Sequence, residues 1–139
     1  MSATTQDSAG TIPRPDITPV NEPHWQGLRD GRLMIQQCPT CGHHWLPARE
    51  DCPSCLSDAP DWVDASGKGT LISWVVYHTA FNKAFAGKIP YCCAIVETEE
   101  GARMMTNIVN WQDGLRADQP VELVIEEEDG VALARFRAV

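Results

Sequence analysis

The sequence predicts a mainly β fold with a short N-terminal helix, a zinc ribbon and a five-stranded barrel of the OB type. Two Cys-x-x-Cys pairs separated by ten residues predict the ribbon. Five short segments rich in β-branched and aromatic residues fill about the last 70 residues and predict the barrel. A five-stranded open sheet is the alternative arrangement. The expected parts are an arm over residues 1–20, the helix and ribbon over 21–65, and the OB-fold domain over 66–139.

A short helix over Asn21–Asp30 is expected to follow the arm. Prolines in the arm prevent regular helix there, and its other residues offer little to bury, so we expect it to be flexible or draped. Asn21 can cap the helix and Pro23 fits its first turn. Trp25 and Leu28 lie three apart on one helical face. Because so short a helix is unstable alone in water, it must pack on this chain or on a partner.

The two cysteine pairs predict one structural zinc ion. Two residues between paired cysteines let both thiolates face the same ion, while backbone N–H groups turn toward the sulfurs. Four thiolates close a tetrahedral site and leave no position for a substrate water. Iron in a four-thiolate site, or His43 or His44 in place of one cysteine, are the alternatives. The predicted ligands are Cys38, Cys41, Cys52 and Cys55.

After a linker over Asp58–Lys68, five strands are expected. They are Leu71–His78, Tyr91–Thr98, Arg103–Trp111, Val121–Glu127 and Val131–Val139. Alternation along the first strand separates two faces, and the sequence leaves open which one is buried. One face carries Leu71, Ser73, Val75 and Tyr77, and the other carries Ile72, Trp74, Val76 and His78.

The connection Thr79–Pro90 is long for a hairpin, and long loops on compact domains are often functional. Phe81 and Phe85 are four apart, so a helical turn would place both rings on one face. With the nearby lysines they suit a ligand that has an apolar arm and phosphates, such as a coenzyme A thioester. The alternative is that the rings plug the barrel end and the lysines are solvated. The candidate ligand-binding residues are Tyr77, His78, Phe81, Lys83, Phe85, Lys88 and Tyr91.

No catalytic constellation emerges from the sequence. It contains no nucleophile elbow, phosphate loop or HExxH motif. Cys92 and Cys93 should point to opposite faces of a strand, so at most one of them meets the core, and neither has a base beside it in sequence. Glu126–Asp129 is interpreted as a solvated hairpin end. We therefore expect no catalytic residue, which favours a binding or assembly role.

Charge and hydropathy exclude several classes of function. The net charge is -8, and the metal segment 38–65 holds one basic residue against five acidic ones, so nucleic-acid phosphates are poor ligands. No apolar run approaches the roughly 18 residues of a membrane span. The N-terminal residues lack the basic and apolar regions of a secretory signal, which favours a cytoplasmic location.

The order of motifs adds a family resemblance. The motifs are Trp25-x-Gly27-Leu28-x-x-Gly31-Arg32-Leu33, the ribbon Cys38-Pro-x-Cys41-Gly to Cys52-Pro-x-Cys55, Gly67-x-Gly69-x-Leu71-x-Ser73-Trp74, and Pro90-Tyr91. Over residues 22–139 the chain resembles acyl-CoA-associated proteins in which a rubredoxin-like zinc ribbon precedes an OB-fold, long catalogued as a domain of unknown function. Lys83 and Lys88 match no fixed position of that family.

The resemblance implies a role beyond what spacing shows. Proteins of this kind are accessory subunits of thiolase-superfamily enzymes, including thiolases, sterol-side-chain aldolases and acyltransferases, and some pair with hot-dog-fold hydratases. The partner would hold the catalytic residues, the zinc would be structural, the acyl-CoA channel would be shared, and residues 11–20 would wrap the partner. The alternatives are a free-standing acyl-CoA-binding protein or thioesterase, and a zinc-ribbon nucleic-acid adaptor.

Overall fold

The structure, a computed structural model, describes residues 12–139, so part of the predicted arm lies outside the described residues. One helix and three short strands precede a larger sheet, and two single-turn 3-10 helices lie in its loops. The elements are α1 (Glu22–Arg29), β1 (Met34–Gln37), β2 (His44–Trp45), β3 (Asp61–Asp64), β4 (Lys68–Tyr77), η1 (Lys83–Phe85), β5 (Tyr91–Thr98), β6 (Arg103–Asn107), η2 (Trp111–Asp113), β7 (Pro120–Glu128) and β8 (Val131–Ala138).

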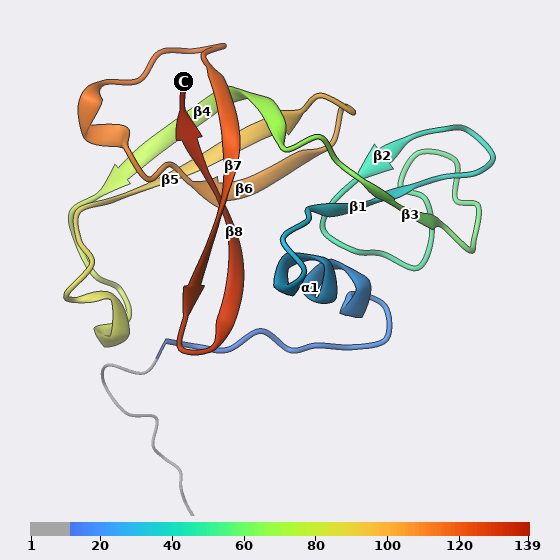
Figure 1. The fold of residues 1–139 in the computed structure, drawn as a ribbon, viewed down its shortest axis with the longest axis horizontal. Coiled ribbons are helices and arrows are strands. Elements are labelled where there is room, and N and C mark those ends of the chain that lie inside the picture. The colour runs from blue at the N-terminus through green and yellow to red at the C-terminus, as the bar shows by residue number, and fades with distance from the viewer. Residues whose placement is uncertain (1–11) are drawn as a thin grey trace, which may run out of the picture.

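The described end of the arm, residues 12–20, passes the tip of the β7–β8 hairpin on its way to α1 (Figure 1). Arg14 donates a hydrogen bond of 2.6 Å to the carbonyl oxygen of Asp129 in that hairpin. Asn21 stands at the N-cap of α1, but its side chain makes no capping bond. Its Oδ1 accepts from the Thr18 N–H at 2.8 Å instead, so the predicted side-chain cap is wrong.

Helix α1 packs on this chain, which answers where the short helix docks. Leu28 is buried in the main core, and Trp25 packs against that core. The same core holds Phe136 of β8 and Leu71 of β4. The helix and the larger sheet are therefore joined by one continuous apolar cluster.

The ribbon is a three-stranded antiparallel sheet in the order β2-β1-β3. Ile35 of β1 is fully buried in the main core. Gln36, the next residue, is also buried, and its amide pairs with the backbone of Arg49 at 2.7 and 3.0 Å. A buried polar side chain is stable only when hydrogen-bonded. Gln36 thus fixes the long ribbon loop onto β1.

The five remaining strands form one antiparallel sheet in the order β6-β5-β4-β7-β8, which curls into a nearly closed barrel (Figure 1). The mainly β fold with an OB-type barrel is confirmed. Strict alternation along the first strand is wrong, because a bulge between Leu71 and Ser73 inserts one residue. Leu71 is buried before the bulge, whereas Trp74 and Val76 face the core after it.

The two edge strands, β6 and β8, meet along a short seam that nearly closes the barrel. Four hydrogen bonds form this seam. Thr106 and Val109 donate to the carbonyl oxygens of Ala134 and Phe136, respectively. The Asn110 side chain bonds both backbone groups of Ala138. The predicted third strand is too long, because β6 ends at Asn107 and Trp111 begins a 3-10 helix. After β6 ends at Asn107, Val109 and Asn110 continue the seam outside the strand.

Candidate functional site

The four predicted metal ligands lie together at the ribbon tip. The sulfur atoms of Cys38, Cys41, Cys52 and Cys55 are all within 4.8 Å of one another. The Cys38–Cys55 and Cys41–Cys52 sulfur distances are 3.5 and 3.6 Å, far beyond a disulfide bond. Zn–S bonds of about 2.3 Å in a tetrahedron require sulfurs about 3.8 Å apart. The cluster therefore has the size and chemistry of a structural zinc site.

The backbone around the cluster favours thiolates. The N–H groups of Cys41 and Cys55 donate to the sulfurs of Cys38 and Cys52 at 3.4 Å each. The Cys41 N–H is the largest cause that lowers the pKa of Cys38 to about 6, against burial, which raises it. Since zinc binds the thiolate form, the knuckle geometry prepares this ligand. His43 stacks on Trp45 at a ring-centroid distance of 5.9 Å and lies outside the cluster.

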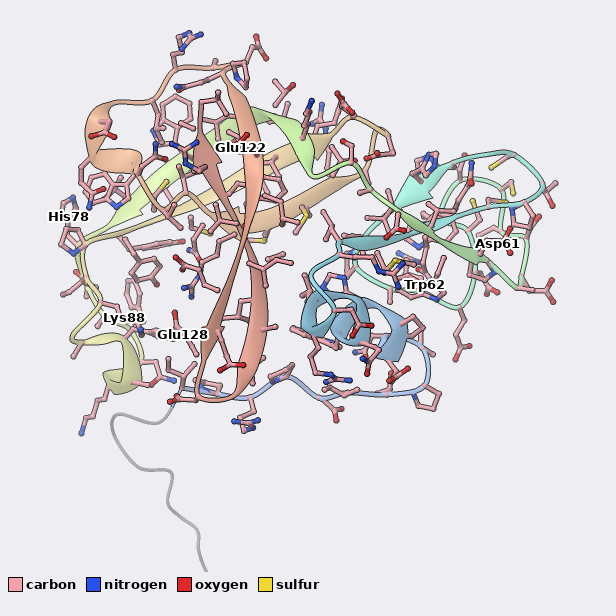
Figure 2. All side chains as sticks on the ribbon, in the orientation of Figure 1. Asp61, Trp62, His78, Lys88, Glu122 and Glu128 are labelled. Carbon is pink, nitrogen blue, oxygen red and sulfur yellow. The ribbon has the colours of Figure 1, made fainter. Side chains whose placement is uncertain are left out.

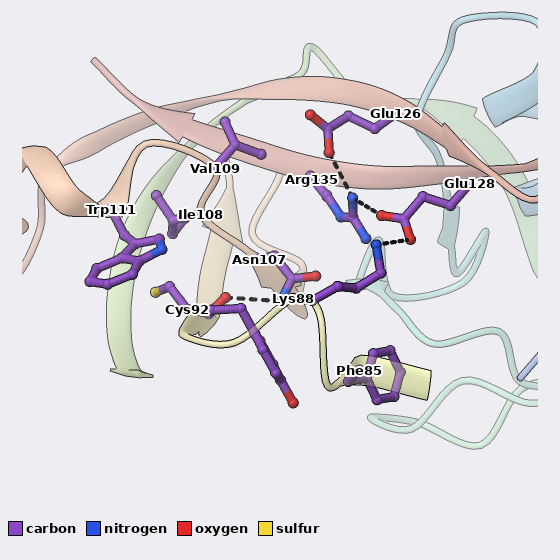
Figure 3. A pocket seen from close by; sticks show the side chains of 11 residues that line it. Phe85, Lys88, Cys92, Asn107, Ile108, Val109, Trp111, Glu126, Glu128 and Arg135 are labelled. Carbon is purple, nitrogen blue, oxygen red and sulfur yellow. Dashed lines mark hydrogen bonds and ion pairs between the residues drawn. The ribbon is translucent and has the colours of Figure 1, made fainter. Parts of the chain in front are cut away.

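A second candidate site is a cavity of about 530 Å³ at the barrel end away from the ribbon (Figure 3). In Figure 2, His78 and Lys88 mark that end of the molecule, whereas Asp61 and Trp62 lie on the ribbon. The cavity is in the size range of small-molecule sites. Its lining is Phe85, Lys88, Tyr91, Cys92, Asn107, Ile108, Val109, Trp111, Glu126, Glu128 and Arg135.

One wall of the cavity carries a network of four charges. Arg135 contacts Glu126 at 2.7 Å and also pairs with Glu128. Lys88 reaches Glu128 at 3.0 Å from the opposite loop. Burial raises the pKa of Glu128, but hydrogen bonds from Lys88 and Arg135 outweigh it and leave the pKa below its ordinary value. Two cations and two carboxylates therefore cancel, and this wall has no net charge.

The other wall is aromatic and apolar. Tyr91 lies between two rings, with centroids 5.4 Å from Tyr77 and 6.1 Å from Phe85. Phe81 contacts only the outer end of this group, edge-on to Tyr77 at 6.2 Å. The helical turn η1 begins after Phe81, so the expected common face of Phe81 and Phe85 is wrong. Phe81 is also 83% exposed, so its side chain does not plug the end of the barrel.

The structure brings three of the seven candidate ligand residues to the cavity: Phe85, Lys88 and Tyr91. The other four, Tyr77, His78, Phe81 and Lys83, are exposed and do not line it. Both faces of strand β5 behave as predicted at its two cysteines, since Cys92 is buried and Cys93 is half-buried. Burial raises the pKa of the Cys92 thiol.

Sequence reasoning missed the charged wall. Glu126–Asp129 was expected to be a solvated hairpin end, but the Glu128 side chain is only 18% exposed. Arg135 is equally covered. A signal was present: an arginine between Ala134 and Phe136 in an apolar strand needs an acidic partner, and the preceding strand ends in acidic residues.

Two family models match the chain in succession. The model of the ChsH2 rubredoxin-like zinc ribbon domain matches residues 25–61. The model of the ChsH2 C-terminal OB-fold domain matches residues 62–126. The matched ranges contain the cysteine cluster, the strands β1 to β6 and most of β7. The fold and the cluster thus define a zinc ribbon joined to an OB barrel.

Two similar proteins show which family the chain belongs to. The chain is 34% identical over 111 residues to a DUF35 domain-containing scaffold protein of Methanocaldococcus jannaschii, covering 76% of this chain and 78% of that protein. One chain of the solved Ltp2–ChsH2(DUF35) aldolase is 35% identical, with a TM-score of 0.78, and the match covers 90% of this chain and 98% of that one. The chain belongs to the DUF35 family.

Two further relatives carry enzyme names. The chain is 35% identical over 136 residues to a probable enoyl-CoA hydratase alpha subunit of Thermomonospora curvata, covering 96% of this chain but only 42% of that protein. It is 28% identical over 135 residues to the benzoylsuccinyl-CoA thiolase subunit BbsA of Thauera aromatica, covering 89% of each. Within residues 12–139, no helix is long and apolar enough to cross a membrane.

Proposed function

We propose that this chain is a non-catalytic, zinc-containing accessory subunit of a cytoplasmic thiolase-like complex that acts on acyl-CoA thioesters. The observation that carries the proposal is the match along 98% of the DUF35 chain of an aldolase complex. The thiolase subunit BbsA, matched over 89% of its length, supports the same class of partner. A hot-dog-fold hydratase is the second candidate partner, because one relative is named as a hydratase alpha subunit.

In this proposal Cys38, Cys41, Cys52 and Cys55 hold one structural zinc ion. When bound, zinc links the two knuckles into one folding unit and supplies no chemistry to a substrate. The strand that enters the first knuckle connects it to the rest of the chain, because Gln36 hydrogen-bonds the ribbon loop and Ile35 is buried in the core. The zinc therefore acts on assembly.

The proposed acyl-CoA ligand rests on the cavity at the barrel end. The pantetheine arm of a coenzyme A thioester is long and uncharged, and its acyl chain is apolar. The cavity offers aromatic and aliphatic walls beside a charge network that is neutral overall. Lys83, exposed on η1 two residues before Phe85, is available to a phosphate group. The proposed ligand residues are the three that line the cavity, with Lys83 at the phosphates.

A free-standing thioesterase is less well supported. Hydrolysis of a thioester by covalent catalysis requires a nucleophile activated by a neighbouring base. The thiol in the cavity is Cys92, whose raised pKa keeps it protonated at neutral pH. The carboxylates there are already paired with Lys88 and Arg135. These groups favour binding over turnover.

Co-expression tests the proposal. The full chain is produced with a thiolase-like subunit of its source organism and analysed by size-exclusion chromatography, followed by thiolysis and retro-aldol assays. We expect the two chains to elute together and the complex to be more active than the partner alone. Elution of this chain by itself, beside a fully active partner, would contradict the subunit role. Thioester turnover by the isolated chain would favour the thioesterase.

A further inference from the structure

The second zinc knuckle ends in an exposed leucine. In the first knuckle, Gly42 donates its N–H to the Cys38 carbonyl at 2.9 Å with φ at 79°. In the second knuckle, Leu56 makes the same 2.9 Å bond to Cys52 with φ at 67°. The two turns are equivalent, but only the first uses a glycine. Leu56 is also 75% exposed.

Leucine at this position is unfavourable for the free chain. A positive φ in this region brings Cβ close to backbone atoms, and glycine avoids that strain. The leucine gains little in return, because three quarters of its surface meets water. Strain retained without a packing benefit points to a role outside the fold.

The base of the same knuckle brings like charges together. Asp51 and Asp58 face each other in an antiparallel bridge that closes the turn containing Leu56. Like charges directly opposite each other destabilise a bridge. Neither carboxylate has an ion-pair partner among residues 12–139, and both residues are exposed. Glu50 adds a third exposed acidic residue next to them.

We propose that residues 51–58 form a docking tip whose anchor is Leu56. The tip inserts the leucine into an apolar socket on a different protein chain, and Lys or Arg side chains around that socket pair with Asp51 and Asp58. This inference rests on the proposed function, which supplies the partner as the larger enzyme subunit. A second copy of this chain is a poor occupant, because two acidic tips on chains of charge -8 repel each other.

Charge complementarity decides the occupant and predicts the salt dependence. An acidic rim around an apolar anchor attracts a basic rim, and such attraction is screened as salt rises. The anchor itself loses exposed apolar surface on docking, and burial of that surface favours association. Association should therefore weaken both when the leucine is removed and when salt is added.

The test uses substitutions with opposite effects on stability and on binding. Leu56→Gly and Leu56→Asn both tolerate a positive φ and remove the anchor. Asp51→Asn combined with Asp58→Asn removes the repulsion and the acidic rim. For the zinc-loaded full-length chain, zinc content, thermal midpoint and affinity for the thiolase-like subunit are measured. The affinity is measured between 50 and 500 mM salt, a range that includes physiological ionic strength, at which the Debye length is roughly 8 Å. Val75→Asn is the matched control, because Val75 is also an exposed apolar residue but lies on β4 and not in residues 51–58.

We expect the Leu56 variants to keep their zinc, to melt about 2 °C higher and to bind at least about tenfold more weakly. The double Asn variant should also melt higher, bind more weakly and lose most of the salt dependence. Val75→Asn should bind as the wild type does. Unchanged affinity of the Leu56 variants, or a loss confined to Val75→Asn, would overturn the docking tip while leaving the subunit role intact. Absence of any wild-type complex would overturn both proposals.

Discussion

Lys88 Nζ lies 3.0 Å from Glu128 Oε1, so one ion pair connects the 79–90 loop to strand β7 across the cavity. Glu128 is held from the other side by Arg135 of β8. The loop is thus fastened to the barrel by a carboxylate that is itself fixed. The loop also makes aromatic contacts, between Phe85 and Tyr91 and between Phe81 and Tyr77.

Lys88→Met should loosen the loop without unfolding the barrel. The Lys88 side chain is 41% exposed, and ion pairs at such positions contribute at most about 1 kcal/mol to the free energy of unfolding. We expect a small loss of stability and faster amide hydrogen exchange over residues 83–90. Lys83→Met, on the same loop without that ion pair, is the control and should leave exchange unchanged. Equal exchange in both variants would show that the ion pair does not hold the loop.

Glu128 should make the free energy of unfolding depend on pH in the acid range. Its pKa is lowered in the folded chain, so its ionised form stabilises the fold fully above the ordinary value of 4.5. That contribution is lost as the pH falls through the lower folded pKa. Urea unfolding of wild type and Glu128→Gln between pH 7 and pH 3 measures it. The stability difference between them should shrink toward the acid end, and a constant difference would contradict the assignment.

The fold could be predicted from sequence because its strongest signals are local. Cysteine spacing specifies the ribbon, and β-branched segments specify the five barrel strands, although β3 lies inside the predicted linker and β4 begins three residues earlier than predicted. The bulge at Leu71–Ser73 could not be predicted, since an inserted residue leaves no mark in an apolar run. The end of β6 was missed because Asn110 pairs with Ala138, which is distant in sequence.

The cavity was only half predictable for the same reason. Loop length and aromatic residues pointed to Phe85, Lys88 and Tyr91, which are neighbours in sequence. The charged wall joins β7, β8 and the loop, and only the folded register brings Arg135 beside Glu126. Residues that meet through a hairpin register are recognised only when the partner strand is known.

Phe85→Ala should enlarge the cavity and weaken the handling of acyl-CoA by the complex. The ring lines the cavity, and truncating an aromatic contact to a ligand removes apolar burial. We expect a severalfold rise in KM for the thioester with the fold retained, measured by steady-state kinetics of the complex. Phe81→Ala is the matched control, because that ring is largely exposed and outside the cavity. Identical kinetics in both variants would remove the cavity from the proposed function.

Gly69→Ala should destabilise the barrel. A Cβ at Gly69 would lie 2.6 Å from the carbonyl oxygen of Glu97, which is backbone of the paired strand and cannot move aside freely. Forced overpacking of this kind costs about 1–3 kcal/mol. Gly87→Ala, which meets no atom within 4 Å, should be close to neutral. Denaturant unfolding of both variants measures the difference, and a stable Gly69→Ala protein would mean that the strands can separate there.

Cys52→Ser should abolish zinc binding and unfold the ribbon. Cys52 is fully buried in the cluster, and structural zinc sites supply on the order of 10 kcal/mol to small domains. We expect a fall from one zinc per chain to almost none, measured by atomic absorption, together with loss of the complex. Cys93→Ser, outside the cluster, should keep its zinc. Chelation should likewise dissociate the complex first, and turnover lost from an intact complex would contradict a structural role.

The seam between β6 and β8 also protects the chain from self-association. A five-stranded sheet that stayed open would present two long unpaired edges, which are templates for aggregation. Here Asn110 bonds both backbone groups of Ala138 and takes the place of a missing strand residue, at 2.8 and 3.0 Å. Together with the hydrogen bonds of Thr106 and Val109, this side chain covers an edge that would otherwise be free to pair with another chain.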